Sequence, residues 1–236
     1  DERLLFESDV FNDNFKKESN IVTLTTNFRQ KGDTEYQQTL NNVRHNTLTS
    51  TDLETLEKAL MKPKTDDIPH LVATNSRADF INKRQLEQLT GKSTTFNATF
   101  KKNLIYDTPD LKQMSEDYLY ELKSQFKQKE METIVLKENC RVMLTRNLDQ
   151  NVGLINGALG YIEKIEKGKV LVRFDNGQER EIEKEKWTLE TDGFKVTATQ
   201  IPLILAYSIT IHKSQSLTLE KARMDLGNCF TYHMAY

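Results

Sequence analysis

One stretch near the end of the chain carries many hydrogen-bonding side chains directly after an apolar run. Residues 209–215 (ITIHKSQ) follow the apolar residues 201–206. A core strand that ends in threonine, histidine, lysine, serine and glutamine offers more polar groups than a simple turn needs. Such groups are typical of contacts to a phosphate backbone, which carry no base readout. The stretch therefore predicts a sequence-independent grip on nucleic acid.

A second cluster, Thr74-Asn75-Ser76, lies where a short strand is expected to end and a helix to begin. The free N–H groups and the dipole of a helix N-terminus attract phosphate. Plain helix capping explains the same three residues and is the favoured interpretation when the cluster is taken by itself. A third candidate is Arg29, which follows an expected strand at residues 21–25. Ligands of open α/β sheets bind at that edge, although a lone arginine there is often a solvated surface residue.

Several other kinds of site are excluded. Gly91-Lys92-Ser93 resembles the end of a phosphate-binding loop, but Leu86 stands where the first glycine of that loop is required. No apolar strand ends in paired carboxylates that could hold magnesium. The four histidines lack the spacing of a metal site, and Cys140 and Cys229 have no partner at CxxC spacing.

Composition limits the class of protein. The 236 residues carry 33 Lys+Arg and 35 Asp+Glu, a formal net charge of -2, so any basic site must be local. No apolar run of about 18 residues and no signal-peptide pattern occurs, which predicts an intracellular protein without a membrane segment. Because the first residue is Asp and the last follows a partly apolar stretch, we expect the chain to be a piece of a longer protein.

The elements that must position these residues follow from periodicity. Asp33 is expected to cap one helix, and Thr51-x-x-Glu54 is a capping box for a second. A strand at residues 71–74 precedes a further helix, for which Asn75 and Ser76 are natural N-caps. Strands alternating with helices predict a parallel sheet.

The middle of the chain has a different character. A Lys/Glu-rich helix at residues 114–129 precedes a β-meander, in which Asp175-Asn176-Gly177 predicts a hairpin turn. Such hairpins suit a small antiparallel barrel. After Gln200 the sequence is apolar again (IPLILAYSITIH, residues 201–212) without strict alternation, which predicts a strand buried on both faces and a return to the parallel sheet.

The segment QIPLILAYSITIHKSQSLTLE resembles motif V of the RecD-like, Pif-type DNA helicases of superfamily 1. Similar patterns occur at FESDVF, LTTNFRQ, LVATNSRADFIN, LKENCRVMLTRNLDQNVGLINGALGYI and VRFDNG. The resemblance implies an α/β fold: a RecA-like parallel sheet with helices, interrupted by a small antiparallel SH3-like β-barrel. Residues 1–104 would be the first part of the second RecA-like motor domain, 105–197 the inserted barrel with its helical lead-in, and 198–236 the return to the motor domain, ending before the last helicase motif.

The resemblance also assigns roles by position. Arg29 would reach the γ-phosphate of ATP and act in catalysis, and Gln30 and Gln215 would also contact the nucleotide. The implied parent is an ATP-dependent 5′-3′ DNA helicase, whose missing first RecA-like domain would hold most of the ATP and Mg²⁺. The implied partners are that domain and single-stranded DNA, on a monomeric enzyme. The residues that would grip the single strand are Thr74, Asn75, Thr210, His212, Lys213 and Ser214.

One position departs from the family pattern, because Ser216 stands where glycine usually follows HKSQ. This departure leaves open that the parent is an inactive helicase relic. A non-catalytic module, in which the barrel and the basic loop bind single-stranded nucleic acid, is the other alternative to a motor. The resemblance further suggests roles in DNA repair, recombination and telomere maintenance, in the nucleus or mitochondrion of a eukaryote.

Overall fold

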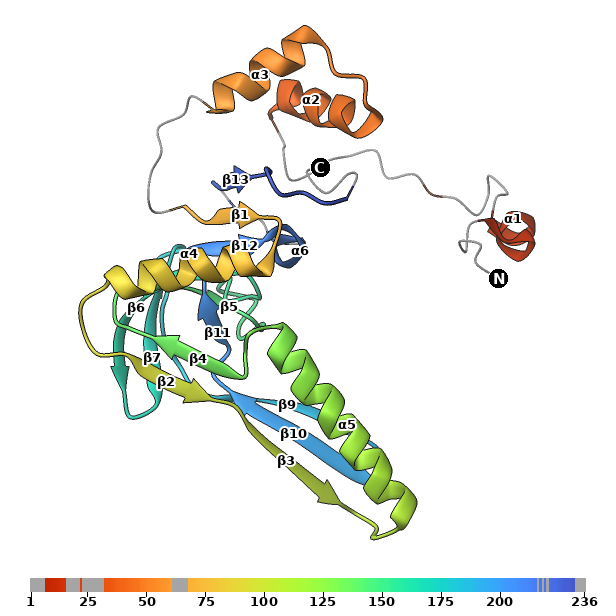
Figure 1. Ribbon diagram of the computed structural model, residues 1–236, viewed down its shortest axis with the longest axis vertical. Helices are drawn as coiled ribbons and strands as arrows, with labels where there is room; N and C mark the ends of the chain where they lie inside the picture. Colours follow the sequence, from red (N-terminus) through yellow and green to blue (C-terminus); the bar gives the residue numbers. More distant parts are fainter. Residues whose placement is uncertain are drawn as a thin grey trace. The chain divides into compact units, whose positions relative to one another are not determined.

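The computed structural model of the chain describes residues 7–15, 22, 32–60, 68–215, 217, 219 and 221–231 (Figure 1). It divides into two compact units, residues 1–62 with 236 and residues 63–235, which are described separately. Within the described ranges, no helix has both the length and the apolar character needed to cross a bilayer. The fold is mixed α/β, with parallel and antiparallel sheets, as the sequence predicted.

The first unit contains the helices α1 (Asp9–Phe15), α2 (Thr34–His45) and α3 (Ser50–Leu60). Asp33 caps α2 as predicted, because its carboxylate accepts a hydrogen bond from the Tyr36 N–H at 3.0 Å. The capping box predicted at Thr51 and Glu54 is wrong. The reciprocal bonds instead join Thr49 and Asp52: the Asp52 N–H donates to the Thr49 hydroxyl, and the Thr49 N–H donates to the Asp52 carboxylate.

Asp52 also ties the two helices together. Its carboxylate, 5% exposed, accepts hydrogen bonds from the Thr39 hydroxyl and the Asn42 amide of α2, both at 2.9 Å. The Thr49 hydroxyl, followed by the Thr49 N–H and the Asn42 amide, holds the pKa of Asp52 well below its usual range. The ionised carboxylate is therefore the link between α2 and α3.

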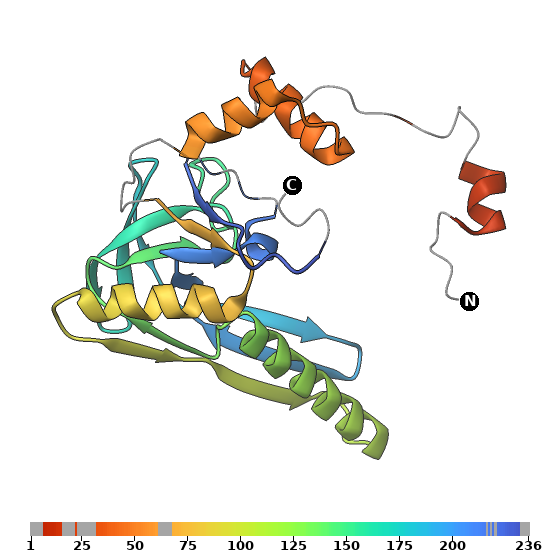
Figure 2. The same cartoon turned by 45° about the horizontal axis from the view of Figure 1, so that its top comes forward.

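In the second unit, three described strands form a parallel sheet: β1 (His70–Val72), β12 (Ser208–Thr210) and β13 (Arg223–Asp225). Their order is β12-β1-β13, and both pairs run parallel, which confirms the predicted parallel sheet. Helix α4 (Asn75–Gln88) packs against β1 and β12 (Figures 1 and 2).

Five described strands form an antiparallel sheet in the order β11-β5-β6-β7-β8. The predicted turn at residues 175–177 is confirmed, because it joins β7 to β8 and Gly177 adopts a φ of +82°. This sheet is open within the described residues, so the closed barrel that we expected is not observed. The strands are β5 (Arg141–Leu144), β6 (Leu159–Glu166), β7 (Lys169–Phe174), β8 (Glu179–Ile182) and β11 (Leu203–Leu205).

The long helix α5 (Pro109–Gln128) packs along β3 and β10 (Figures 1 and 2). In the described part of the chain, β10 pairs with β3 and β9, and β2 pairs with β4. Strand β10 crosses the predicted domain boundary at 197/198. The boundaries at 104/105 and 197/198 stay predictions. The bounds are β2 (Thr94–Asn97), β3 (Thr99–Leu104), β4 (Thr133–Leu136), β9 (Glu185–Glu190) and β10 (Phe194–Gln200).

The apolar residues 201–212 were predicted to form a strand buried on both faces and to return the chain to the parallel sheet. The return is confirmed, but these residues form two strands rather than one. Residues Leu203–Leu205 form β11, which pairs antiparallel with β5. The chain enters the parallel sheet only at Ser208, as β12. Burial on both faces is common to the two sheets, so apolar character alone did not reveal where the chain passes from one to the other.

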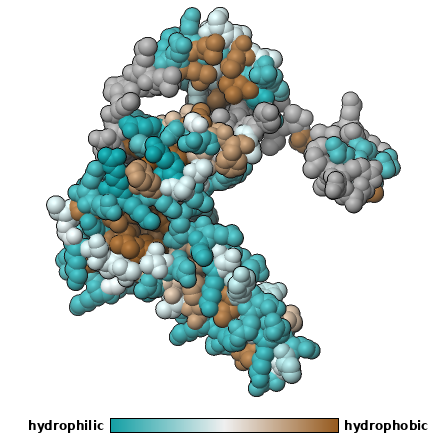
Figure 3. Space-filling model, viewed as in Figure 1, coloured by the Kyte–Doolittle hydropathy of each residue, from teal (hydrophilic) through white to brown (hydrophobic). Residues whose placement is uncertain are grey.

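A groove of about 500 Å³ opens beside α4, β4, β11 and the end of α5. Its floor is apolar, formed by Leu86, Ile134 and Ile204 among others, while Asp79 and Glu130 line it with charge. Figure 3 shows this apolar surface next to α4, bordered by polar residues. The groove is lined by α4 on one side and by β4 and β11 of the antiparallel strands on the other.

Candidate nucleic-acid interface

The pairing of β1 with β12 brings two of the predicted clusters to one edge of the parallel sheet. Leu71 pairs with Ile209 and Val72 with Thr210, so both strands end at the same level. Asn82 of α4 fixes this arrangement: its side chain donates to the Ser208 carbonyl and accepts from the Ser208 N–H, each at 2.9 Å. The residues after Val72 and after Thr210 therefore emerge side by side.

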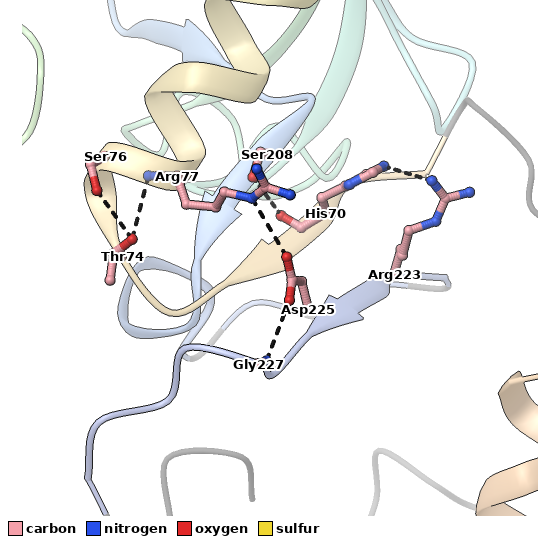
Figure 4. A network of polar contacts seen from close by, with 8 residues as sticks. All are labelled: His70, Thr74, Ser76, Arg77, Ser208, Arg223, Asp225 and Gly227. Atoms are coloured by element: carbon pink, nitrogen blue, oxygen red, sulfur yellow. Dashed lines mark hydrogen bonds and ion pairs between the residues drawn. The ribbon is translucent and has the colours of Figure 1, made fainter.

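Helix α4 begins at this edge, and its N-cap is Thr74. The Thr74 hydroxyl accepts a hydrogen bond from the Arg77 N–H at 3.4 Å and lies 3.3 Å from the Ser76 hydroxyl (Figure 4). Our prediction that Asn75 and Ser76 cap this helix is wrong, since both lie inside its first turn. The first N–H groups of a helix have no intrahelical acceptor, so this exposed turn is suited to bind an anion.

The second cluster forms the short helix α6 (Ile211–Ser214), directly after β12. Thr210, only 3% exposed, caps it by accepting from the Lys213 N–H at 3.2 Å. The Ser214 hydroxyl donates back to the Ile211 carbonyl at 2.8 Å. His212 of α6 and Gln215, which directly follows α6, are exposed. Their places agree with a phosphate-facing edge, but a role for each in binding stays a prediction.

Lys213 has a partner that the sequence did not reveal. Its ammonium lies 2.9 Å from a carboxylate oxygen of Glu130, which follows α5. Glu130 belongs to a Lys/Glu-rich stretch that is typical of a solvated helix face, so no sequence signal distinguished it from its neighbours.

Further charged residues lie along the neighbouring strand β13, and Figure 4 shows them. The Arg77 guanidinium lies 3.6 Å from the Asp225 carboxylate, and both side chains are 40–47% exposed. His70 and Arg223 approach to 3.1 Å, the ring nitrogen Nε2 facing the guanidinium. These contacts connect α4 and β1 to β13, and because β13 has no motif-like pattern, they could not be predicted from the sequence.

A loop between β5 and β6 packs against the chain that follows α6. Gly157 has a φ of +95°, and a Cβ placed there would lie 2.2 Å from the Leu217 side chain. Only glycine meets both conditions. The antiparallel sheet therefore directly supports the segment that carries the predicted grip.

The predicted ATP contacts Arg29 and Gln30, and the unusual Ser216, lie outside the described residues. Gln215 is described, and it ends α6 at the same edge as the grip residues. Across the described ranges, no group of three or more His, Cys, Asp or Glu residues could hold a metal ion.

Comparisons with known proteins agree with this geometry. Residues 121–165 match the family model described as DNA helicase Pif1, 2B domain. The chain is 31% identical over 162 residues to an ATP-dependent DNA helicase PIF1 of Xenopus laevis, and 33% identical over 159 residues to that of Homo sapiens. These alignments cover 67% and 66% of this chain but only 23% and 22% of the relatives. The chain thus spans under a quarter of their length.

Solved structures give the same result over a longer stretch. The Pif1 helicase of Candida albicans shares 28% identity and a TM-score of 0.68, covering 98% of this chain and 56% of that one. A Bacteroides Pif1 bound to single-stranded DNA shares 28% identity and a TM-score of 0.58, covering 92% and 48%. The similarity therefore extends over both described units.

Proposed function

Since this chain corresponds in sequence and fold to the C-terminal region of the Pif1-type superfamily 1 DNA helicases, we propose that its parent protein is an ATP-dependent DNA helicase. The parent translocates 5′-3′ on single-stranded DNA and unwinds duplex. This chain supplies part of the second RecA-like domain, and its open antiparallel sheet corresponds to the SH3-like insertion. A first RecA-like domain of the same polypeptide completes the motor, which acts as a monomer.

The observation that carries the proposal is the pairing of Val72 with Thr210. It places the α4 N-terminus beside α6, so Thr74, Asn75, His212 and Lys213 share one edge of the sheet. Backbone N–H groups, hydroxyls and an ammonium together suit phosphate and make no demand on base identity. This supports a grip that moves along single-stranded DNA of any sequence.

The proposed contact with ATP lies at the C-terminal end of the segment 210–215, directly after the grip residues. Gln215 directly follows the grip, so a nucleotide contact there would be one residue away from Ser214. Arg29 and Gln30 would approach the phosphates as well, with the guanidinium of Arg29 stabilising charge on the transferring phosphoryl group. The first RecA-like domain would provide most of the contacts to Mg²⁺.

The test compares the complete parent protein with this chain alone. DNA-stimulated phosphate release and unwinding of duplexes with 5′ or 3′ single-stranded tails are measured side by side. We expect the parent to turn over ATP at about 1–100 per second and to unwind only the 5′-tailed duplex, and the chain alone to do neither. A parent that binds single-stranded DNA without ATP turnover would instead favour the binding module or the inactive relic.

A further inference from the structure

The ammonium of Lys213 is held by a residue from a distant part of the chain. Its Nζ lies 2.9 Å from the Oε1 of Glu130, 83 positions earlier in sequence. The two side chains are 24% and 34% exposed, so solvent screens the pair only partly. Lys213 lies on α6, in the predicted DNA grip, whereas Glu130 lies at the end of the helix that precedes the antiparallel strands.

The backbone around Glu130 fixes where its carboxylate lies. Glu130 has a φ of +59°, a conformation in which glycine or asparagine is usually found. Hydrogen bonds on both sides hold it there: the Glu130 N–H donates to the Lys127 carbonyl at 3.1 Å, and the Met131 N–H to the Phe126 carbonyl at 2.8 Å. Met131, 2% exposed, anchors the turn in the core. The carboxylate is thus directed at Lys213 from a rigid turn.

A second carboxylate, that of Asp79, interacts with Glu130. Burial raises the pKa of Glu130, the ion pair with Lys213 opposes that rise, and Asp79 of α4 adds to it. The Glu130 carboxylate thus offsets the attraction of the Lys213 ammonium for a phosphate.

We infer that Glu130 is a positioning residue that competes with DNA phosphate for the Lys213 ammonium. This inference rests on the proposed function, since it assumes that Lys213 grips single-stranded DNA. An ammonium has three N–H donors, and Glu130 occupies one of them and cancels the charge. Binding of phosphate must loosen this ion pair, so the strength of the grip depends on how the end of α5 is placed against α6.

The test uses the complete parent protein and measures equilibrium binding of a fluorescent thymidine oligonucleotide over a series of KCl concentrations. Glu130→Gln keeps the size and backbone preference of the side chain but removes its charge. We expect it to tighten binding about fivefold and to steepen the slope of log K against log salt by about 0.7, as for one more phosphate contact. Glu132→Gln, an equal charge change two residues away on an exposed side chain, should change affinity by less than about twofold.

A double-mutant cycle identifies the partner. In a Lys213→Ala background, Glu130→Gln should have no effect, because there is no ammonium left to release. Unchanged or weaker binding by Glu130→Gln, or an equal gain in the Lys213→Ala background, overturns the competition. If Glu130→Gln does not fold, Glu130→Asn, which suits the left-handed backbone, takes its place.

The outcomes also separate this inference from the proposed function. If Lys213→Ala leaves DNA binding and its salt dependence unchanged, both the grip and the competition are overturned. If Lys213→Ala weakens binding while Glu130→Gln does not strengthen it, only the competition is overturned, and the grip stands.

Discussion

The Arg141 guanidinium of β5 donates to both carboxylate oxygens of Asp175, with two N–O distances of 2.5 Å. Arg141 also lies over the ring of Tyr161 in β6, 4.6 Å from its centroid. Asp175 belongs to the turn between β7 and β8. The bidentate ion pair therefore connects β5 to that turn across β6. The Arg141 side chain is 7% exposed, whereas that of Asp175 is 51% exposed.

We expect Asp175→Asn to lower the free energy of unfolding by about 1–2 kcal/mol, because it leaves a buried guanidinium with a weaker partner. Arg141→Lys should cost a similar amount, since lysine lacks the planar fork and the ring stacking. Urea unfolding followed by tryptophan fluorescence measures both changes. Asp192→Asn, in the exposed turn between β9 and β10, is the control, and an equal loss of stability in that variant would contradict the role given to the ion pair.

Asp52→Asn should loosen the pair of helices α2 and α3. A group whose pKa is lowered by folding contributes stability above its unfolded pKa, about 3.9 for Asp, and loses that contribution as the pH falls. Hydrogen exchange over residues 34–60 should therefore be faster in Asp52→Asn at pH 7. The difference from the unaltered chain should shrink as the pH falls below about 4.

The exposed Glu54 of the same helix provides the control for that experiment. Glu54→Gln should leave exchange over residues 34–60 nearly unchanged at both pH values. A difference between Asp52→Asn and the unaltered chain that stays constant from about pH 7 to about pH 3 would show that the ionised carboxylate is not the link.

His212→Ala with Lys213→Ala in the parent protein should weaken binding of single-stranded DNA alike for every base sequence, because these groups would contact phosphate. For each phosphate that the variant no longer binds, the salt slope should fall by about 0.7. Fluorescence anisotropy with homopolymeric and mixed oligonucleotides measures this. Lys195→Ala, which removes an ammonium on β10, is the matched control. Loss of affinity for some sequences only would point to base contacts instead.

Arg29→Ala in the parent protein should lower kcat far more than it weakens nucleotide binding, because a fixed positive charge helps most as charge develops on the transferring phosphoryl group. Arginine fingers contribute about 10³–10⁵ in rate, and we expect the low end. Arg29→Lys should restore only part of the activity. Steady-state ATPase with saturating single-stranded DNA is compared with equilibrium binding of a nucleotide analogue.

Arg180→Ala, which removes an exposed guanidinium on β8 to which no role is assigned, controls for the loss of an arginine. A drop in kcat of less than about tenfold in Arg29→Ala, or about 1.4 kcal/mol, would return Arg29 to the role of a solvated surface residue.

Local chemistry made part of this structure predictable. The Asp33 cap and the turn at residues 175–177 depend on side chains within a few positions of one another, and both predictions were confirmed. The capping box failed for a related reason: Thr49 and Asp52 have the same spacing as Thr51 and Glu54, and contacts of Asp52 to Thr39 and Asn42 decided between them. Those contacts join two helices, so sequence spacing did not contain them.

In the candidate site, too, the strand arrangement could be predicted, whereas side-chain contacts between distant segments could not. Neighbouring strands could be predicted to bring residues 74–75 and 210–214 to one edge, because parallel strands share their carboxyl ends. The ion pair between Lys213 and Glu130 could not, since it joins two exposed-looking charges 83 positions apart. Likewise, the passage of the chain from β11 to β12 depends on which sheet each strand pairs with, and both sheets bury apolar residues.

The pairing of β1 with β12 has a consequence for how the protein is made. Ser208 pairs with His70, 138 positions earlier, so the ribosome must add that many residues before β1 meets its partner. At about 5–20 residues per second this takes on the order of 10 s. During synthesis the Asn82 side chain lacks its hydrogen-bond partner until Ser208 has been added. The antiparallel sheets are complete before β12 arrives, and contacts at such separations form slowly. The edge that carries the proposed grip therefore assembles after the antiparallel sheets, and a nascent chain stalled before β12 would lack that edge.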